Sequence, residues 1–352
     1  GGALLCWSDC SFHIHSGVLF RGNSARFNGG AIHLHTDTIA HIGPEVRIME
    51  NVVNGGEDGG GGISVYEHSV ATIRGSVLDG NRALYGHGGA VFLYTLGAIS
   101  VIDSVLERNA CRQNGGGIFG KRETSMHVLS GCIVRMNQAG GAGGALSSDG
   151  FNGAIQVANH SLLANNSAAG DGGAIASARN GSVHLSGAVV MGNLAEKGSG
   201  GALWAGSGSL VAITSGSNIS SNHAGFGGGG LAIELGSDLV MSDTELTANS
   251  AVANGGAVLG VGSLHLRMTS CRIGHNEAAE GGGLSLGAEC VVFFNETDMP
   301  SNRAKEGCGG ALLAERGQIV VSSSVMSTNH ASEAGGLAYL ARSPSLSSRG
   351  GG

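Results

Sequence analysis

The chain has 352 residues, a formal net charge of −7 and 13% charged residues, with 66 glycines and 3 prolines. It contains no basic run, which excludes nucleic acid and anionic membrane as expected partners, because both are bound through clustered Lys and Arg. It also contains no stretch of about 18 continuous apolar residues, so we expect no membrane insertion of this segment.

A box of similar residues recurs along the whole chain. It begins with Asn, usually places Ala two residues later, and ends in a glycine pair before an aliphatic residue, as in "NSARFNGGAI" from Asn23. Successive boxes start 26 to 30 residues apart, and this period predicts a solenoid rather than two globular domains. The box asparagines are Asn23, Asn51, Asn81, Asn109, Asn137, Asn166, Asn193, Asn222, Asn249, Asn276, Asn302 and Asn329.

Each repeat predicts the same elements in the same order. A short alternating strand leads to the asparagine, with an apolar residue three positions before it and a small residue five positions before it, as Leu106 and Ser104 precede Asn109. A loop of variable length follows, and then the glycine box and a second strand such as "AIHLH", residues 31–35. No segment shows a sustained apolar period of 3.6 residues, so we expect no helices.

This pattern predicts an all-β, single-chain right-handed parallel β-helix of about 12 to 13 coils of about 28 residues. Three short strands per coil would use that period, and thirteen glycine boxes predict a rod of roughly 60 Å. The asparagines are expected to form a structural ladder at one corner, where Asn tolerates the left-handed region and hydrogen-bonds its neighbour. The competing fold, a β-propeller, is disfavoured because each blade needs roughly 40 or more residues.

The array is expected to occupy residues 1–340, followed by a Ser/Gly-rich tail or linker at 341–352. Residue 1 lies inside a glycine box, and "ARSPSLSSRGGG" offers no cap. Because exposed solenoid ends template further strand pairing, we expect a segment of a longer chain, or other protein segments or subunits that cap its ends.

The boxes resemble the repeats of the polymorphic outer-membrane proteins of chlamydiae, which are written GGAI and FxxN. "GGAI" stands at residues 29–32 and 172–175, and "FRGN" at 20–23 is the literal FxxN. The resemblance covers nearly the whole chain. It implies a secreted passenger rod that is used in adhesion.

Many parallel β-helices cleave polysaccharides with paired carboxylates on adjacent coils. Asp103 and Asp243 share a phase but lie five coils apart, and Asp79, Glu107 and Asp298 are assigned to different phases. The sequence therefore predicts no catalytic residues and no enzyme.

One acidic column is predicted near the end of the array. Glu280, Glu306 and Glu333 each follow a box asparagine by four residues in successive coils. Glutamates stacked about 5 Å apart repel one another unless a cation or the nearby Lys305 offsets their charge. Two hypotheses follow, a calcium site at these glutamates or solvated loops, and the sequence predicts no cofactor other than this calcium ion.

Histidines are dense near the start of the chain. Alternation places His33 and His35 on the outer face around Leu34, and "HIH" does the same for His13 and His15. Such pairs could hold a transition metal, but the two pairs occupy different phases, so polar outer-face residues are the favoured interpretation. The aromatic residues are assigned no common column that would make a sugar platform: Trp7, Trp204, Tyr66, Tyr85 and Tyr94.

Seven cysteines do not fix the cellular compartment. Cys111, Cys132 and Cys271 occupy columns of small residues and are expected to be buried fillers. Cys6 and Cys10 are close enough in sequence to bridge. The remaining two, Cys290 and Cys308, are assigned neither role.

Together these patterns predict a non-enzymatic structural or adhesive rod of a large cell-surface or extracellular protein. Its expected partners are surface glycans or host or neighbouring proteins. The alternative is a polysaccharide-binding or polysaccharide-cleaving β-helix protein whose site the sequence does not identify. Activity on a polysaccharide panel would separate the two.

Overall fold

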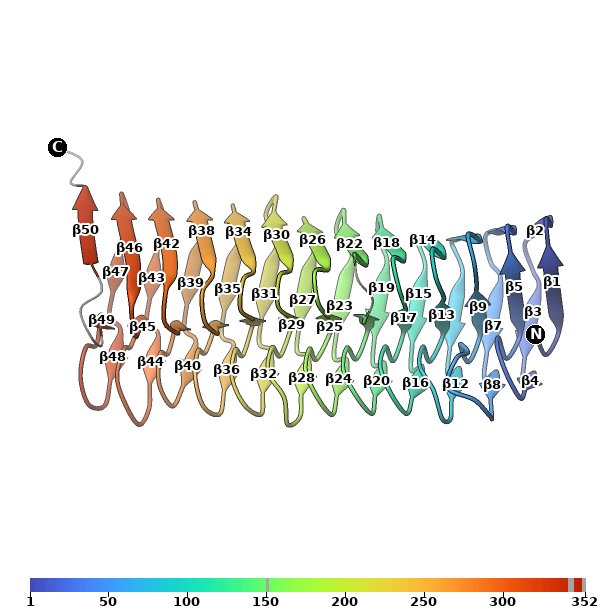
Figure 1. Cartoon of the computed structure of the whole chain (residues 1–352), viewed down its shortest axis with the longest axis horizontal. Helices are drawn as coiled ribbons and strands as arrows, with labels where there is room; N and C mark the ends of the chain where they lie inside the picture. Colours follow the sequence, from blue (N-terminus) through green and yellow to red (C-terminus); the bar gives the residue numbers. More distant parts are fainter. Residues whose placement is uncertain (150–151, 341–344, 350–352) are drawn as a thin grey trace.

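A computed structural model describes residues 1–149, 152–340 and 345–349 of the chain. Its regular structure consists of short β-strands that repeat coil after coil along one axis, so the molecule is a rod (Figure 1). Each strand pairs in parallel with its equivalent one coil further on, and the strands form four long sheets, here called A to D. The predicted all-β parallel solenoid is confirmed. Among the described residues, no helix is long and apolar enough to cross a membrane.

Sheet A holds the strand that follows each glycine box. Its thirteen strands make twelve steps, which at about 4.8 Å each give a sheet of about 58 Å, close to the predicted length. The strands are β1 (Leu4–Ser8), β5 (Ile32–Thr36), β9 (Ile63–Val65), β13 (Val91–Leu93), β17 (Ile118–Gly120), β21 (Leu146–Ser148), β25 (Ile175–Ser177), β29 (Leu203–Ala205), β33 (Leu231–Ile233), β37 (Val258–Gly260), β41 (Leu284–Leu286), β45 (Leu312–Ala314) and β49 (Ala338–Leu340).

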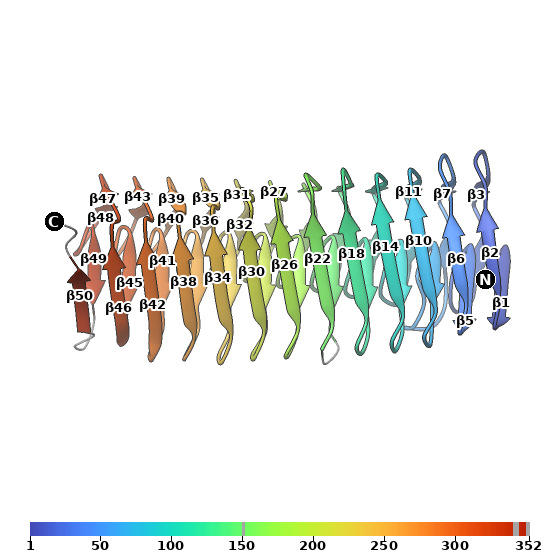
Figure 2. The same cartoon turned by 90° about the horizontal axis from the view of Figure 1, so that it is seen from above.

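Sheet B comes next in every coil and forms a second long face of the rod (Figure 2). Its last strand, β50, lies inside the segment predicted as a tail. The backbone of β50 pairs in parallel with β46 and so adds one more strand to the sheet. The strands are β2 (Ser11–Ile14), β6 (Ile39–Ile42), β10 (Val70–Arg74), β14 (Ala98–Ile102), β18 (Ser125–Leu129), β22 (Ala154–Ala158), β26 (Ser182–Ser186), β30 (Leu210–Thr214), β34 (Asp238–Ser242), β38 (His265–Thr269), β42 (Cys290–Asn295), β46 (Gly317–Ser322) and β50 (Ser345–Arg349).

Sheet C holds the strand that leads to each box asparagine. Ten strands form a continuous sheet, and two more pair separately after it. They are β3 (Leu19–Arg21), β7 (Arg47–Met49), β11 (Val77–Asp79), β15 (Val105–Glu107), β19 (Ile133–Arg135), β23 (Leu162–Ala164), β27 (Val189–Met191), β31 (Asn218–Ser220), β35 (Glu245–Thr247), β39 (Arg272–Gly274), and then β43 (Met299–Pro300) with β47 (Met326–Ser327).

Sheet D consists of two-residue strands that directly follow the box asparagines. It makes four strands per coil, not the three predicted, because strands this short show no alternation in the sequence. They are β4 (Ser24–Ala25), β8 (Val52–Val53), β12 (Arg82–Ala83), β16 (Ala110–Cys111), β20 (Gln138–Ala139), β24 (Ser167–Ala168), β28 (Leu194–Ala195), β32 (His223–Ala224), β36 (Ser250–Ala251), β40 (Glu277–Ala278), β44 (Arg303–Ala304) and β48 (His330–Ala331).

The asparagine ladder runs unbroken between sheets C and D. Nδ2 of Asn51 donates to Oδ1 of Asn81 at 2.9 Å, and its backbone N–H donates to the same oxygen at 3.1 Å. The second Nδ2 hydrogen goes to the Phe20 carbonyl at 3.0 Å. The same two bonds to the next asparagine recur at every step from Asn23 to Asn329. The ladder satisfies amide groups that would otherwise be buried without partners.

The left-handed corner lies one residue earlier than predicted. None of the ladder asparagines has a positive φ, whereas every residue just before one does. The residue before the asparagine therefore adopts the strained left-handed conformation of the turn. The asparagine itself stays extended, so its side chain can reach the next coil. The twelve left-handed residues are Gly22, Glu50, Gly80, Arg108, Met136, Asn165, Gly192, Ser221, Ala248, His275, Ser301 and Thr328.

Glycine is required at the two positions of a box for different structural reasons. Gly88 has a φ of 64°, a left-handed conformation that glycine adopts without steric cost. At Gly89, a Cβ would lie 2.1 Å from the Gly116 carbonyl oxygen and 2.5 Å from the backbone nitrogen of Ala110. The second glycine is therefore needed because the chain of sheet D passes directly against it.

The core confirms the apolar column predicted three residues before each asparagine. These side chains are buried from Ile48 to Met299, while the outermost members, Phe20 and Met326, are half-buried. The small residues two positions after the asparagine belong to the sheet D strands and form separate clusters, such as the one containing Ala83 and Cys111. The sequence columns thus correspond to rows of stacked side chains.

Candidate functional site

On the outer side of sheet A, a row of residues lies between the segments that precede and follow each strand, and we call this strip the sheet A groove. The first and third residues of each short strand point into the core, so the middle residue points outward. Several middle residues are nevertheless buried, including His33, Phe92 and Phe119. We call this row the groove floor. We call the residues just after each sheet A strand the turn wall, and those just before each glycine box the loop wall.

Aromatic side chains form a row on the turn wall at the N-terminal end, with two stacked pairs, Trp7–His35 and Tyr66–Tyr94. The ring centroids of Trp7 and His35 are 4.3 Å apart, those of His35 and Tyr66 are 6.1 Å apart, and those of Tyr66 and Tyr94 are 5.0 Å apart. The prediction that Trp7, Tyr66 and Tyr94 share no column was therefore wrong. All three lie six residues after the first glycine of a box. Counting from the asparagine obscures this phase, because the loops between asparagine and box differ in length.

The chain's own side chains close this end of the groove. The Tyr66 hydroxyl donates across the floor to Oδ1 of Asn28 and lies 3.0 Å from the Asp58 carbonyl oxygen. Nζ of Lys121, on the turn wall, reaches Oδ1 of Asp58 at 2.8 Å and lies 5.5 Å from the Tyr94 ring centroid. Both walls are thus joined by internal contacts, and the rings of Trp7 and His35 and those of Tyr66 and Tyr94 stack in pairs.

His33 lies on the outer side of sheet A, as predicted, but it is only 1% exposed. Burial, with smaller contributions from the N-terminal amine and His35, lowers the pKa of His33 to about 3. Its ring packs edge-on against Tyr66 with centroids 4.8 Å apart. His33 is therefore a neutral part of the floor.

Of the other histidine pair, His13 lies in β2 of sheet B and His15 directly follows that strand. His13 and His41 are register partners whose rings stack with centroids 4.7 Å apart, and His15 lies 6.3 Å from His13. No group of three His, Cys, Asp or Glu residues that could hold a metal ion occurs within residues 1–149, 152–340 and 345–349. The transition-metal hypothesis gains no support from this arrangement.

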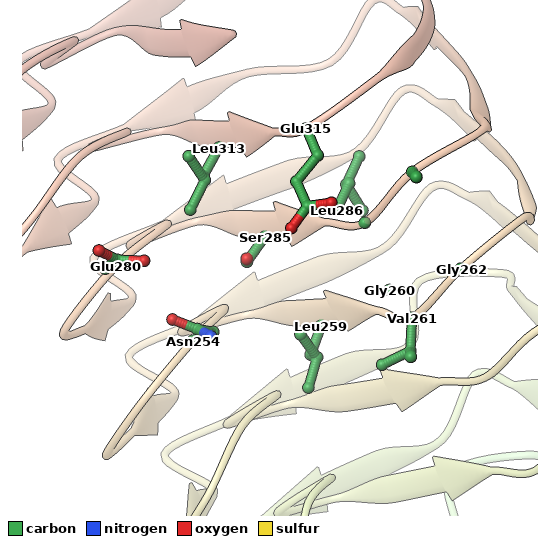
Figure 3. A pocket seen from close by; sticks show the side chains of 12 residues that line it. Asn254, Leu259, Gly260, Val261, Gly262, Glu280, Ser285, Leu286, Leu313 and Glu315 are labelled. Carbon is green, nitrogen blue, oxygen red and sulfur yellow. The ribbon is translucent and has the colours of Figure 1, made fainter. Parts of the chain in front are cut away.

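At the C-terminal end the groove opens into a cavity of about 580 Å³ (Figure 3). Leu259, Ser285 and Leu313 are register partners in β37, β41 and β45 and form its floor. Glu280 on the loop wall and Glu315 on the turn wall lie on opposite sides of Ser285. The cavity therefore combines an apolar floor with two carboxylates.

Four polar side chains line this cavity: Asn254, Glu280, Ser285 and Glu315. Within the described part of the chain, none of them has a side-chain hydrogen bond or an ion pair. Ser285 is only 7% exposed, yet its hydroxyl faces the cavity. No sequence motif marks this site, because its members come from three coils at different distances from their asparagines.

The three glutamates predicted to stack do not form one column. Backbone hydrogen bonds between successive glycine boxes place Glu280 in register with Cys308, and Cys308 in register with Ala334. Glu306 lies two residues before Cys308, and Glu333 lies one residue before Ala334. The unequal loop lengths therefore separate the carboxylates that the asparagine count had aligned.

The cation expected to offset this column is engaged elsewhere. Nζ of Lys305 pairs with Oε1 of Glu277, in the preceding coil. A calcium site at Glu280, Glu306 and Glu333 stays a hypothesis, and its test is calorimetric titration with calcium. Heat release together with a raised melting temperature would support it.

Sheet C contains carboxylates in register, contrary to the assignment of different phases to Asp79 and Glu107. These two are direct partners, both two residues before a ladder asparagine. Arg108 lies 2.6 Å from Asp79 and 2.9 Å from Glu107, and Arg135 lies 2.7 Å from Glu107. The pair is neutralised by arginines, so it is an ion-pair network that supports the coil.

The described residues contain one bridged pair of cysteines and five free cysteines. Cys6 and Cys10 form a disulfide with a Cα–Cα distance of 6.2 Å. Cys111, Cys132 and Cys271 are free and buried, which confirms them as fillers. The two unassigned cysteines are also free: Cys290 is buried and Cys308 is half-buried.

These features define a class of protein, a parallel β-solenoid held by an internal asparagine ladder and glycine boxes. Residues 160–178 match the family model of the Chlamydia polymorphic membrane protein repeat. The matched segment contains Asn166 and the "GGAI" box at 172–175, the residues that build the ladder and the close turn. The chain is thus similar to this repeat, as its sequence indicated. No curated protein and no solved structure matches it.

Proposed function

We propose that the chain is a non-enzymatic adhesive rod of a large cell-surface or extracellular protein. The match to a membrane-protein repeat supports a surface location. The observation that carries the adhesive role is the open end of the groove, where Asn254, Glu280, Ser285 and Glu315 face a cavity without internal partners. Of these four only Ser285 is buried, and buried polar groups normally find hydrogen-bond partners, so an external ligand is the natural partner of its hydroxyl, with the exposed Glu280 and Glu315 beside it.

The rod holds this groove in a fixed shape. The asparagine ladder and four sheets fix each coil on the next, so the floor and walls are positioned by backbone pairing rather than by mobile loops. A preorganised surface loses little conformational entropy when it binds. This rigidity suits a passenger segment that presents a binding face.

Adhesion can be measured with microspheres coated with residues 1–352. We expect them to be retained under flow on cell layers or extracellular matrix, and Ser285→Trp, which fills the cavity, should reduce retention. Ser100→Trp is the matched control, because Ser100 lies on the outer face of sheet B. Retention no better than that of uncoated microspheres would refute the adhesive role.

A second candidate function is polysaccharide binding or cleavage. It is favoured by one observation, the two carboxylates of Glu280 and Glu315 on opposite sides of the groove. A carboxylate pair that flanks a glycosidic bond can act as acid and base or nucleophile. Release of reducing ends from a polysaccharide panel, abolished by Glu280→Gln or Glu315→Gln, would establish this function in place of the adhesive one.

A further inference from the structure

We propose that the C-terminal cavity of the sheet A groove binds an arginine or lysine side chain presented by an extended segment of a protein partner. This inference rests on the proposed adhesive function and names its ligand chemistry.

The floor suits the aliphatic part of a long cationic side chain. Leu259, Ser285 and Leu313 occupy equivalent positions on adjacent strands. A serine between two leucines leaves a notch at the sheet spacing of about 4.8 Å per strand. Lys and Arg pack their methylene stems on apolar surface while the charged group stays in a polar environment.

The walls suit the charged end. Glu280 and Glu315 face the notch from opposite sides, and the residues that line the cavity include no Lys, Arg or His. Neither carboxylate has an ion-pair partner in the part of the chain that the structure describes. Ser285 and Asn254 add oxygen acceptors close to the same space. Carboxylates that accept charge-assisted hydrogen bonds from a guanidinium or ammonium group make the strongest contacts of this kind.

The N-terminal end of the groove already contains this interaction within the chain. Lys121 lies on the turn wall, six residues after the first glycine of its box, at the position that Glu315 occupies in its own coil. Its Nζ crosses to Asp58 on the loop wall at 2.8 Å and lies over the Tyr94 ring. A lysine thus fills the groove where the chain supplies one. At the C-terminal end the acidic walls are present, but the lining residues supply no cation.

The cavity is larger than one side chain. A volume of about 580 Å³ lies within the range of small-ligand sites, which is about 300 to 1,000 Å³. It therefore has room for residues that flank the cation in an extended segment. Such a segment can lie along the groove, so we assign the cation to a protein partner.

The probe is a fluorescein-labelled peptide, Arg-Ser-Arg-Ser-Arg, measured by fluorescence anisotropy with the full chain. We expect saturable binding, and at least tenfold weaker binding of the same peptide with citrulline, which keeps the shape of arginine but lacks its charge. Glu280→Gln combined with Glu315→Gln should weaken binding of the arginine peptide at least tenfold. Ser285→Leu, which fills the notch without changing charge, should also weaken it.

The matched control is Glu306→Gln combined with Glu333→Gln. It removes the same charge near the same end of the rod but outside the cavity, and it should change binding less than twofold. Equal losses in the two double variants would show bulk attraction to an acidic protein and overturn the proposal. So would equal binding of the citrulline peptide, or the absence of saturable binding.

Adhesion assays on the same variants separate this inference from the proposed function. Microspheres that adhere equally well with and without Glu280→Gln/Glu315→Gln would overturn the cation site while leaving the adhesive role intact. A different outcome is that the unmodified chain binds a glycan and not the arginine peptide. If that glycan binding is lost in the cavity variants, the cavity is assigned to a carbohydrate and the proposal is overturned. Arginine-peptide binding that is lost in the cavity variants supports the cation site even if no adhesion is observed.

Discussion

Asn166 donates two hydrogen bonds to one atom, Oδ1 of Asn193, from its backbone N–H at 2.9 Å and from Nδ2 at 3.0 Å. Asn193 in turn donates from Nδ2 to the Leu163 carbonyl at 3.1 Å. Removing the side chain leaves buried donors and an acceptor without partners. We expect Asn193→Ala to lower the free energy of unfolding by about 3 kcal/mol or more, as measured in urea. Asn254→Ala is the control and should change it little; equal effects would contradict the ladder's role.

The left-handed corner predicts a stabilising substitution. Ala248 has a φ of 54°, which a residue with a Cβ adopts at a cost of roughly 1 to 2 kcal/mol. Glycine removes that strain but gains entropy in the unfolded chain. The balance predicts that Ala248→Gly raises the free energy of unfolding by about 0.5 to 1 kcal/mol. Ala251→Gly, in the extended strand β36, should instead destabilise.

The close approach at the glycine box predicts a strongly destabilising substitution. Gly89→Ala places a methyl group 2.1 Å from a backbone oxygen of the next coil, which can move only if the coil separates. We expect a loss of about 3 kcal/mol or more in chemical denaturation. Gly216→Ala has a similar chemical change at a φ of 74° with no heavy atom within 4 Å, so only backbone strain of about 1 kcal/mol is expected. Comparable losses would show that contact is not the cause.

Acidification should weaken the N-terminal coils. The folded pKa of His33, about 3, lies below the unfolded value of 6.5, so the unfolded chain binds more protons between these values. The contribution is fully present above pH 6.5 and is lost as the pH falls toward 3. At pH 4.5 the loss is about 2 to 3 kcal/mol relative to pH 7. Urea unfolding at both pH values should show a smaller pH effect in His33→Gln, whereas the exposed control His184→Gln should match the unmodified chain.

Thiol labelling tests the cysteine assignments. Burial raises the pKa of Cys111 to about 12 and that of Cys290 to about 11, and it also raises the pKa values of Cys132 and Cys271. Because the thiolate is the reactive form, these four should resist labelling in the folded chain. We expect one thiol, Cys308, to react with a chromogenic disulfide, and four more after denaturation without reductant. Rapid labelling of the buried four would contradict the packing.

Features that repeat at a constant distance from the asparagine could be predicted from the sequence. The ladder, the apolar column before it and the small column after it recur there in nearly every coil, because sheets C and D directly flank the asparagine. The fillers Cys111 and Cys132 were recognisable for the same reason. A period of about 28 residues was then sufficient to predict the solenoid.

Features counted across the loop could not be predicted in this way. Trp7, Tyr66 and Tyr94 form one row only when counted from the glycine box, and Glu280 separates from Glu306 by the same shift. Backbone pairing restarts at the box, since the second glycine must meet the next coil there. The cavity also depends on one small residue, Ser285, between two leucines. A difference in the size of a single side chain forms no recognisable sequence motif.

The ladder also gives the rod an electrical direction. Every step from Asn23 to Asn329 points the amide donor of one coil toward the oxygen of the next, and no step is reversed. The side-chain amide dipoles therefore add head to tail instead of cancelling, and neighbouring bonds polarise one another. A junction that continues this row must present oxygen to the donor-facing side and N–H groups to the acceptor-facing side. Two solenoid segments of this kind can consequently continue the ladder only when the donor-facing end of one meets the acceptor-facing end of the other.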